Sequence, residues 1–572
     1  MASERPNILV IMTDQLRHPT AYETEEVSRF RREKLTAETG LRNSGVSFEH
    51  HYVMSTACTP SRASIITGQY PSLHGVTQTD GLAKNADDKD MFWLAPNTVP
   101  TIGDLFRAGG YRTFYKGKWH ISHAYLEAAD GKGHLQSMNA DGSPVPENIA
   151  AYLKADLLDG YGFSEWVGPE PHGLGYNNTG TAKDPFTANE TIDLLQRLDK
   201  DENKQPWLTV CSFLNPHDIA LFGIFALAQG LRYETSEMPR VPNSPTYDED
   251  LSTKPACQQS YVDVWGKILA PQPWIETHRR FYYQMQLAVD EQVKRVLDAL
   301  RATDAYDNTI VIFTSDHGDM LGAHGGMHQK WHNAYEETVR VPFIVSSPLI
   351  HGGAREIDIP TSHADLLPTL LGLAGIKQDE ALRRVAADHV EARPLVGRDL
   401  SGLILGNPKN PPSDPVFFMT DDEISEGTAK PGSPFQRWAR MIGTYETVVQ
   451  PNHIETVIAR IDVDGEQHLV KLSRYHDNQQ FWTAPGEYDE RLVRGKKVVT
   501  VTEAATDEYE LYDLTVDPLE QHNLAHPGAA DDRSRKLHER MLQLLVEQLA
   551  AKRLAPAAGE TPGYRPPKKN QD

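Results

Sequence analysis

The sequence predicts an α/β fold with a large, mixed but mostly parallel sheet flanked by helices, followed by a small C-terminal antiparallel sheet with a helix. The first observation is a set of apolar runs that end in polar residues, such as 8–12 before Asp14 and 309–314 before Asp316. Buried parallel strands have this pattern, and ligands bind at their carboxyl edge. The second is segment 275–302, whose apolar residues repeat at three and four, as on an amphipathic helix.

The other elements follow from the same periodicities, taken in chain order. Helices are expected near 29–38, 98–108, 188–198, 364–371 and 533–552, and strands at 111–115, 207–213, 343–346, 416–420, 447–449, 467–472 and 498–501. The apolar stretch 219–228 is either a buried helix or the wall of an apolar substrate pocket. The last four strands supply the predicted small antiparallel sheet.

The 572 residues are expected to form two domains. A Pro-rich stretch at 408–415 marks the boundary between a catalytic domain, 1–407, and a C-terminal subdomain, 408–572. The Pro- and Lys-rich tail from about residue 555 is expected to be disordered.

Charge and cysteine usage limit the partners and the compartment. The net charge of −22, from 57 basic and 79 acidic residues, argues against nucleic acid or an anionic membrane as the main partner. The three cysteines form no closely spaced framework, which indicates a reducing compartment. The first apolar run, 8–12, is too short for a signal peptide or a membrane span. A cytoplasmic protein is therefore expected.

The stretch Cys58-Thr59-Pro60-Ser61-Arg62 combines a thiol, two hydroxyls and a guanidinium directly before a helix start. Unpaired backbone N–H groups at a helix start favour an anion, so these residue types suit an anionic ester. The order Cys-x-Pro-Ser-Arg resembles the signature of type I sulfatases, in the alkaline phosphatase superfamily. In that family the cysteine is oxidised to formylglycine, whose hydrated aldehyde is the nucleophile.

Four further motifs resemble the same family in the same order. They are Gly-Tyr-Arg-Thr-x-x-x-Gly-Lys-Trp-His at 110–120, Ser-Asp-His-Gly-Asp at 315–319, the segment 329–342 and the segment 510–525. The resemblance runs from about residue 6 to 550. It implies an alkaline-phosphatase-like fold and metal-dependent hydrolysis of aryl or alkyl sulfate esters.

The resemblance also implies the roles of individual residues. One divalent cation would be held by oxidised Cys58 together with Asp14, Gln15, Asp316 and His317. Arg62 would hold the hydrated aldehyde, Lys118 and Lys330 would bind ester oxygens, His217 would protonate the leaving alcohol, and His120 would be the base that restores the aldehyde. Asp14 on its own could equally cap the next segment. The partners implied are a small-molecule sulfate or phosphate ester and a maturation enzyme for Cys58, and a homo-oligomer stays open.

Two residues depart from the usual sulfatase pattern. Gln15 stands where an acid is usual, and His317 supplies nitrogen where many sulfatases supply an amide oxygen. Nitrogen ligation favours Mn²⁺ over Ca²⁺. The combination is similar to that of phosphonate monoester hydrolases, so phosphonate or phosphodiester cleavage is the main alternative. A thiol hydrolase with reduced Cys58 and a metal-stabilised binding protein without activity are two further hypotheses.

Overall fold

The computed structural model describes residues 5–564 apart from 81–83, 85, 87, 89–90, 130, 132, 171–174, 266–274, 408–414, 425–446, 494–496 and 560–561. Within these residues, no helix is long and apolar enough to cross a membrane.

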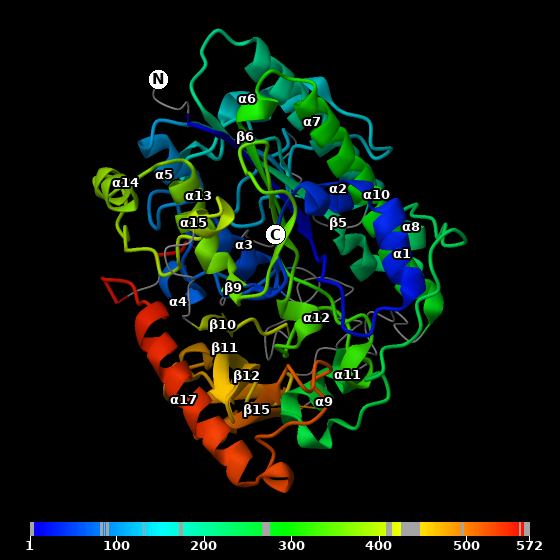
Figure 1. The fold of residues 1–572 in the computed structure, drawn as a ribbon, viewed down its shortest axis with the longest axis vertical. Coiled ribbons are helices and arrows are strands. Elements are labelled where there is room, and N and C mark those ends of the chain that lie inside the picture. The colour runs from blue at the N-terminus through cyan, green and yellow to red at the C-terminus, as the bar shows by residue number, and fades with distance from the viewer. Residues whose placement is uncertain are drawn as a thin grey trace.

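A seven-stranded sheet forms the centre of the molecule (Figure 1). Its order is β4 (Arg112–Gly117), β5 (Trp207–Pro216), β1 (Asn7–Asp14), β6 (Thr309–Ser315), β7 (Phe343–Ser346), β2 (Gly45–Phe48) and β8 (Arg355–Ile357). The first four strands run parallel, whereas β7 is antiparallel to both of its neighbours. This arrangement confirms the predicted mixed, mostly parallel sheet.

The two faces of this sheet are covered by different helices, because alternate residues of a strand point to opposite faces. Leu9 and Ile11 of β1 pack in one apolar cluster with α7 (Gly180–Lys200) and α10 (Glu276–Arg301). Ile8 and Val10 pack in another with α3 (Cys58–Thr67), α5 (Ile102–Ala108) and α13 (Leu366–Leu373). The predicted amphipathic helix 275–302 is thus confirmed as α10.

The carboxyl ends of the central strands lie side by side. Met12 of β1 is in register with Ser212 of β5 and Thr314 of β6. Because these strands are parallel, the residues that follow them meet at one edge of the sheet. Residues 219–228, after β5, form a short 3₁₀ turn and α8 (Ile224–Ala228), and Ile219 and Phe222 pack against the aromatic residues of α10. At these two positions the stretch is therefore buried core.

A second, four-stranded antiparallel sheet lies at the C-terminal end (Figure 1). Its order is β10 (Val416–Thr420), β11 (His453–Val463), β12 (Glu466–His476) and β15 (Glu508–Asp513). Helix α17 (Asp532–Lys552) buries Met541 and Leu545 against this sheet. The predicted small antiparallel sheet with a helix is confirmed.

Two details of the predictions for the C-terminal strands are wrong. Residues 447–449 form no strand, and β11 was not predicted. The segment 498–501 is a strand, but it pairs with β13 (Asp489–Val493) as β14 (Lys497–Val501) in a separate hairpin. In the described part of the tail, Tyr564 exchanges two backbone hydrogen bonds of 2.9 Å with Trp93, and the disorder expected from about residue 555 stays a prediction.

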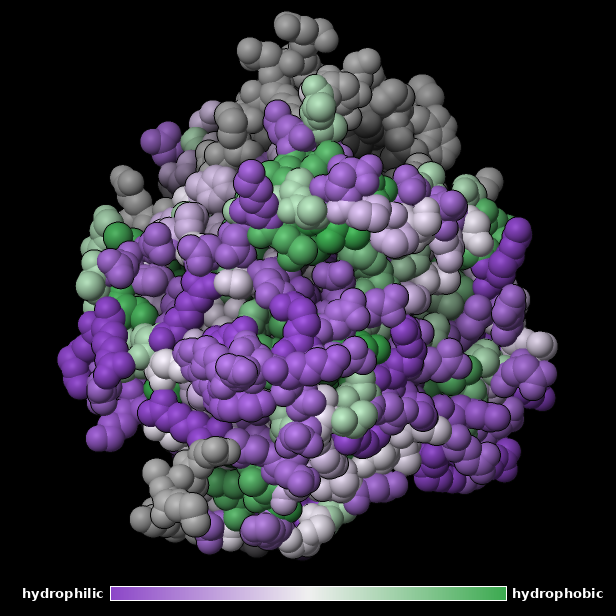
Figure 2. Space-filling model, turned by 90° about the horizontal axis from the view of Figure 1, so that it is seen from above, coloured by the Kyte–Doolittle hydropathy of each residue, from purple (hydrophilic) through white to green (hydrophobic). Residues whose placement is uncertain are grey.

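The other elements are short or lie at the periphery. They are α1 (Glu25–Lys34), α2 (Thr36–Ser44), α4 (Pro71–His74), α6 (Pro146–Ala155), α9 (Ala256–Trp265), α11 (Ala323–Gly326), α12 (Glu336–Val339), α14 (Gln378–Val385), α15 (Ser401–Ile404), β3 (His51–Tyr52) and β9 (Thr361–Ser362). Figure 2 shows one face of the molecule, which is mostly hydrophilic with separate hydrophobic patches.

Candidate active site

Four side chains meet at the carboxyl edge of the large sheet. Asp14 ends β1, Asp316 and His317 follow β6, and Cys58 is the first residue of α3. All four are buried, and one ligand atom of each lies within 4.8 Å of the others. Among the described residues this is the one group of His, Cys, Asp and Glu side chains with metal-binding geometry. His324, His328 and His332, which follow one another at four-residue spacing in the sequence, are not part of such a group.

His317 faces this cluster with a nitrogen lone pair. Its Nδ1 lies 2.9 Å from the carbonyl oxygen of Gly318, which can only accept, so Nδ1 carries the proton. Its Nε2 lies 3.1 Å from Cys58 Sγ and 3.9 Å from Asp14 Oδ1. Burial lowers the pKa of His317. Asp316 Oδ1 lies 3.7 Å from the same nitrogen, and a neutral imidazole with Nε2 directed at a thiol and two carboxylates has the form of a metal ligand.

Arg62 holds the two carboxylates of the cluster in place. Its Nε donates to Asp316 Oδ2 at 2.8 Å, and its Nη2 donates to Asp14 Oδ2 at 3.0 Å. Its Nη1 donates to Ser212 Oγ and to the carbonyl oxygen of Lys118, both at 2.9 Å. The side chain is completely buried. Arg62 is therefore a rigid part of the site, with the two carboxylates compensating its charge.

Two lysines border the cluster from different segments. Lys118 Nζ donates to Asp14 Oδ2 at 2.6 Å, and Lys330 Nζ donates to Gln15 Oε1 at 2.8 Å. Burial alone would raise the pKa of Asp14, but the charges of Lys118, His217 and Arg62 hold it well below the usual range. Asp14 is thus a carboxylate at neutral pH.

Gln15 occupies the position where an acid was expected by resemblance. Besides its contact with Lys330, its Nε2 donates to Asp319 Oδ2 at 2.5 Å, and its backbone N–H donates to Asp316 Oδ1 at 3.0 Å. The side-chain amide of Gln15 therefore donates through its nitrogen to Asp319 and accepts through its oxygen from the Lys330 ammonium.

His217 lies beside this group at the end of β5. Burial lowers its pKa well below the ordinary value, the charges of Lys118 and Lys330 lower it further, and Asp14 opposes them. A bound anionic ester would bring a negative charge to the same place and raise the pKa of His217.

His120 is held a short distance away, beside the residue that follows Cys58. Its Nε2 lies 2.7 Å from Asp80 Oδ1 and 3.3 Å from Thr59 Oγ1. Glu170 Oε1 accepts from the backbone N–H groups of Trp119 and His120, at 2.9 and 2.7 Å. The structure therefore brings together all the residues that the sequence singled out, with His120 at the margin.

Sequence reasoning missed three residues that complete these contacts. Asp80 lies in no motif or predicted element, and Ser212 lies within the predicted strand 207–213, where nothing marked it as a site residue. Asp319 lies in the Ser-Asp-His-Gly-Asp motif, but its partner Gln15 is 304 residues away.

The Cys58 thiol is poorly suited to act as a nucleophile itself. Burial and the neighbouring Asp14 raise its pKa to about 11. Since the thiolate is the reactive form, a reduced Cys58 would be almost entirely inert at neutral pH. This finding weighs against the thiol hydrolase hypothesis.

Residues 6–376 match the sulfatase family model, and the chain belongs to that family. The protein is a sulfuric ester hydrolase, which confirms the hydrolysis of sulfate esters implied by the sequence motifs.

One sequence relative and two solved structures illustrate what the chain is similar to. The choline-sulfatase of Rhizobium meliloti (strain 1021) is 29% identical over 406 residues, which cover 69% of this chain and 72% of that protein. The solved 2-O GAG sulfatase BT1596 aligns with a TM-score of 0.59 and 22% identity over 96% of this chain and 93% of that one. The phosphonate monoester hydrolase of Agrobacterium radiobacter aligns with a TM-score of 0.52 and 20% identity over 95% and 96%. These two structures establish the alkaline-phosphatase-like fold.

Proposed function

We propose that the chain hydrolyses a small-molecule sulfate ester by means of a formylglycine made from Cys58 and one divalent cation. The observation that carries the proposal is the buried cluster of Asp14, Cys58, Asp316 and His317, because it combines metal ligands with the residue to be oxidised. A maturation enzyme is required for that oxidation. We also propose a cytoplasmic location, since all three cysteines are unpaired.

The residues fit a divalent cation by their chemistry. Two carboxylates and a neutral imidazole nitrogen are typical ligands, and we propose that the amide oxygen of Gln15 joins them. When bound, the cation supplies Lewis-acid polarisation of the ester oxygens and lowers the pKa of a coordinated hydroxyl. The nitrogen of His317 favours Mn²⁺ over Ca²⁺.

The chain's own residues would bind and orient the ester. Its oxygens carry negative charge, which Lys118 and Lys330 can neutralise from the two sides of the cluster. The Arg62 guanidinium would fix the hydrated aldehyde of residue 58 while it holds Asp14 and Asp316.

Two histidines would move protons. His217 would donate to the oxygen of the leaving alcohol. His120 would take a proton from the second hydroxyl of residue 58, with Asp80 fixing the orientation of its ring at 2.7 Å.

Peptide mass spectrometry tests the modification directly. Conversion of Cys58 to the aldehyde replaces sulfur and two hydrogens by oxygen, so the peptide should be about 18 mass units lighter. An intact thiol in fully active protein would exclude the proposed nucleophile.

Phosphonate monoester or phosphodiester hydrolysis is the second candidate, favoured by Gln15 and His317. A turnover panel on metal-reconstituted protein separates the two, with an aryl sulfate, an aryl phosphodiester and a phosphonate monoester that share one leaving group. We expect the highest kcat/KM for the sulfate. A higher value for the phosphonate would favour the second candidate, and no turnover of any member by formylglycine-containing protein would refute both.

A further inference from the structure

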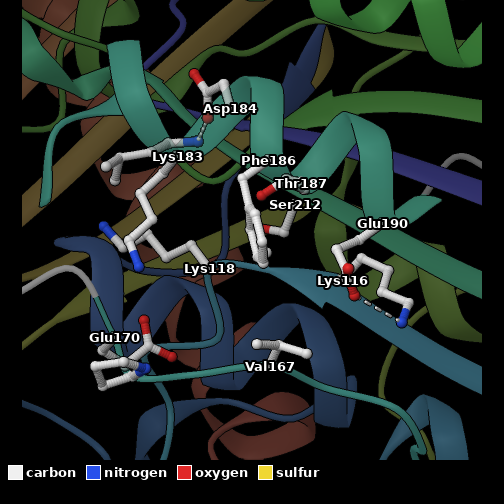
Figure 3. A pocket seen from close by; sticks show the side chains of 13 residues that line it. Lys116, Lys118, Val167, Glu170, Lys183, Asp184, Phe186, Thr187, Glu190 and Ser212 are labelled. Carbon is white, nitrogen blue, oxygen red and sulfur yellow. Dashed lines mark hydrogen bonds and ion pairs between the residues drawn. The ribbon is translucent and has the colours of Figure 1, made fainter. Parts of the chain in front are cut away.

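A small hollow of about 30 Å³, open to solvent, lies beside Lys118, between the end of edge strand β4 and helix α7 (Figure 3). Its polar lining includes Lys116, Lys118, Glu170, Lys183 and Glu190, and Phe186 and Val167 supply apolar walls. Lys118 contacts Asp14 of the cluster, and Glu170 holds the backbone of Trp119 and His120, as described above. The hollow therefore adjoins the catalytic cluster and shares one side chain with it.

Most charged groups of this lining already have partners. Lys116 forms ion pairs with Glu190 at 3.6 Å and with Glu165 at 3.5 Å. Glu170 accepts from two backbone N–H groups, as described above. Asp184, which also lines the hollow, accepts from the backbone N–H groups of Leu214 and Asn215 at 2.6 and 3.0 Å.

Lys183 differs from these groups. Its ammonium forms no hydrogen bond or ion pair with any residue that the structure describes. Burial lowers the pKa of Lys183 to about 8, and the negative charge of Glu170 opposes this shift. The side chain is thus still mainly charged at neutral pH. In Figure 3 the amino ends of Lys183 and Lys118 point into the same part of the hollow.

Asp14 compensates the charge of Lys118 at 2.6 Å, whereas the half-buried ammonium of Lys183 has no such partner among the described residues, so an anion in the hollow would balance its charge. We propose that this hollow binds a compact oxyanion, a carboxylate or sulfate, with Lys183 as its principal ligand and Lys118 shared with the ester site. The inference rests on the proposed function, because the anion would be a second acidic group on the substrate. Free inorganic sulfate has the same chemistry and is the other source.

Chemical labelling tests the site without any need for turnover. With limiting acetic anhydride at pH 8, Lys183 should be acetylated faster than exposed lysines, because more of it is uncharged. Saturating inorganic sulfate should slow its acetylation about tenfold and leave that of Lys200, at the exposed end of the same helix, unchanged. Equal rates for Lys183 with and without sulfate would overturn the anion site, whatever the enzyme hydrolyses.

Kinetics then identify the source of the anion. Two aryl sulfates with the same ring, one of them with an added carboxylate, are compared for Lys183→Met and for the matched control Lys200→Met. We expect Lys183→Met to raise KM about tenfold for the carboxylated substrate alone, as the loss of a charge-assisted hydrogen bond predicts. The control should change neither substrate by more than about twofold.

If both substrates keep their KM but inhibition by inorganic sulfate weakens about tenfold, the hollow takes free sulfate. If neither substrate discrimination nor sulfate inhibition changes in Lys183→Met, the hollow has no role in anion binding and the proposal is wrong. The parent aryl sulfate serves as the internal check, because its turnover tests the proposed function independently of Lys183.

Discussion

At the scale of single residues, Arg62 carries the most contacts in the site. Its three nitrogens reach Asp14, Asp316, Ser212 and a backbone carbonyl, so the guanidinium fixes two strand ends and the start of α3 in one arrangement. A lysine has one charged nitrogen and cannot reproduce this geometry.

We therefore predict that Arg62→Lys lowers kcat by more than about 100-fold and the free energy of unfolding by about 3 kcal/mol. Steady-state kinetics and urea denaturation measure the two effects. The control Arg32→Lys alters an exposed ion pair with Glu25 and should change stability by less than about 0.5 kcal/mol. An Arg62→Lys enzyme within tenfold of the wild-type rate would contradict the positioning role.

His317 is the residue that we propose sets the metal preference. Asparagine in its place offers oxygen instead of nitrogen, and oxygen suits calcium better. We predict that His317→Asn reverses the order of activation by Mn²⁺ and Ca²⁺ in metal-free protein, measured as kcat/KM over a titration of each ion. The same order in both proteins would mean that His317 does not decide the metal.

At the scale of elements, helix α17 stabilises the C-terminal sheet through one buried stripe. Leu545 is fully buried, whereas its neighbour Val546 is 59% exposed. We predict that Leu545→Ala lowers the free energy of unfolding of this region by about 2–5 kcal/mol, and Val546→Ala by less than about 0.5 kcal/mol. Hydrogen exchange of β11 and β12 detects the difference. Equal protection in the two variants would show that α17 does not support the sheet.

The elements also show what sequence can and cannot predict. The strand β1 is buried along its whole length, so its apolar run was readable. Strand β11 was missed because Glu455 interrupts its apolar pattern. In the fold that carboxylate is buried and pairs with Arg474 and Arg553, at 3.2 Å each, partners that are distant in sequence. Composition likewise could not reveal that Tyr564 pairs with Trp93.

The same distinction between local patterns and distant contacts explains which residues of the site were predictable. The ligands at strand ends were predictable because parallel strands bring their carboxyl ends together, and the family motifs added Arg62, Lys118 and Lys330. The pairing of His120 with Asp80 depends on a loop that no periodicity marks. The domain boundary near residue 408 stays a prediction.

At the scale of the whole molecule, buried histidines couple stability to pH. Burial lowers the pKa of His74, His278 and His363 to about 3 and that of His328 to about 4. In the unfolded chain these groups take up a proton as the pH falls through about 6.5, whereas in the folded protein they do not. Stability should therefore decline from about pH 6.5 down to about pH 4.

Replacing one of these histidines should lower by one the number of protons that the chain takes up on unfolding in this pH range. We predict that His278→Gln reduces the loss of unfolding free energy between pH 7 and pH 5 by about 2 kcal/mol. Urea denaturation of both proteins at the two pH values measures it, and the exposed His351→Gln serves as control. An unchanged pH dependence in His278→Gln would show that His278 is protonated in the folded state as well.

The burial of Cys58 determines the order in which its oxidation and the folding of the chain can take place. Only 2% of this residue is exposed, beneath the lysines and carboxylates of the site. A second protein cannot reach a thiol in that position once the sheet and α3 have assembled. If Cys58 is to become an aldehyde, the oxidation has to take place on the nascent or unfolded chain. A molecule that folds before this oxidation keeps the thiol and stays inactive.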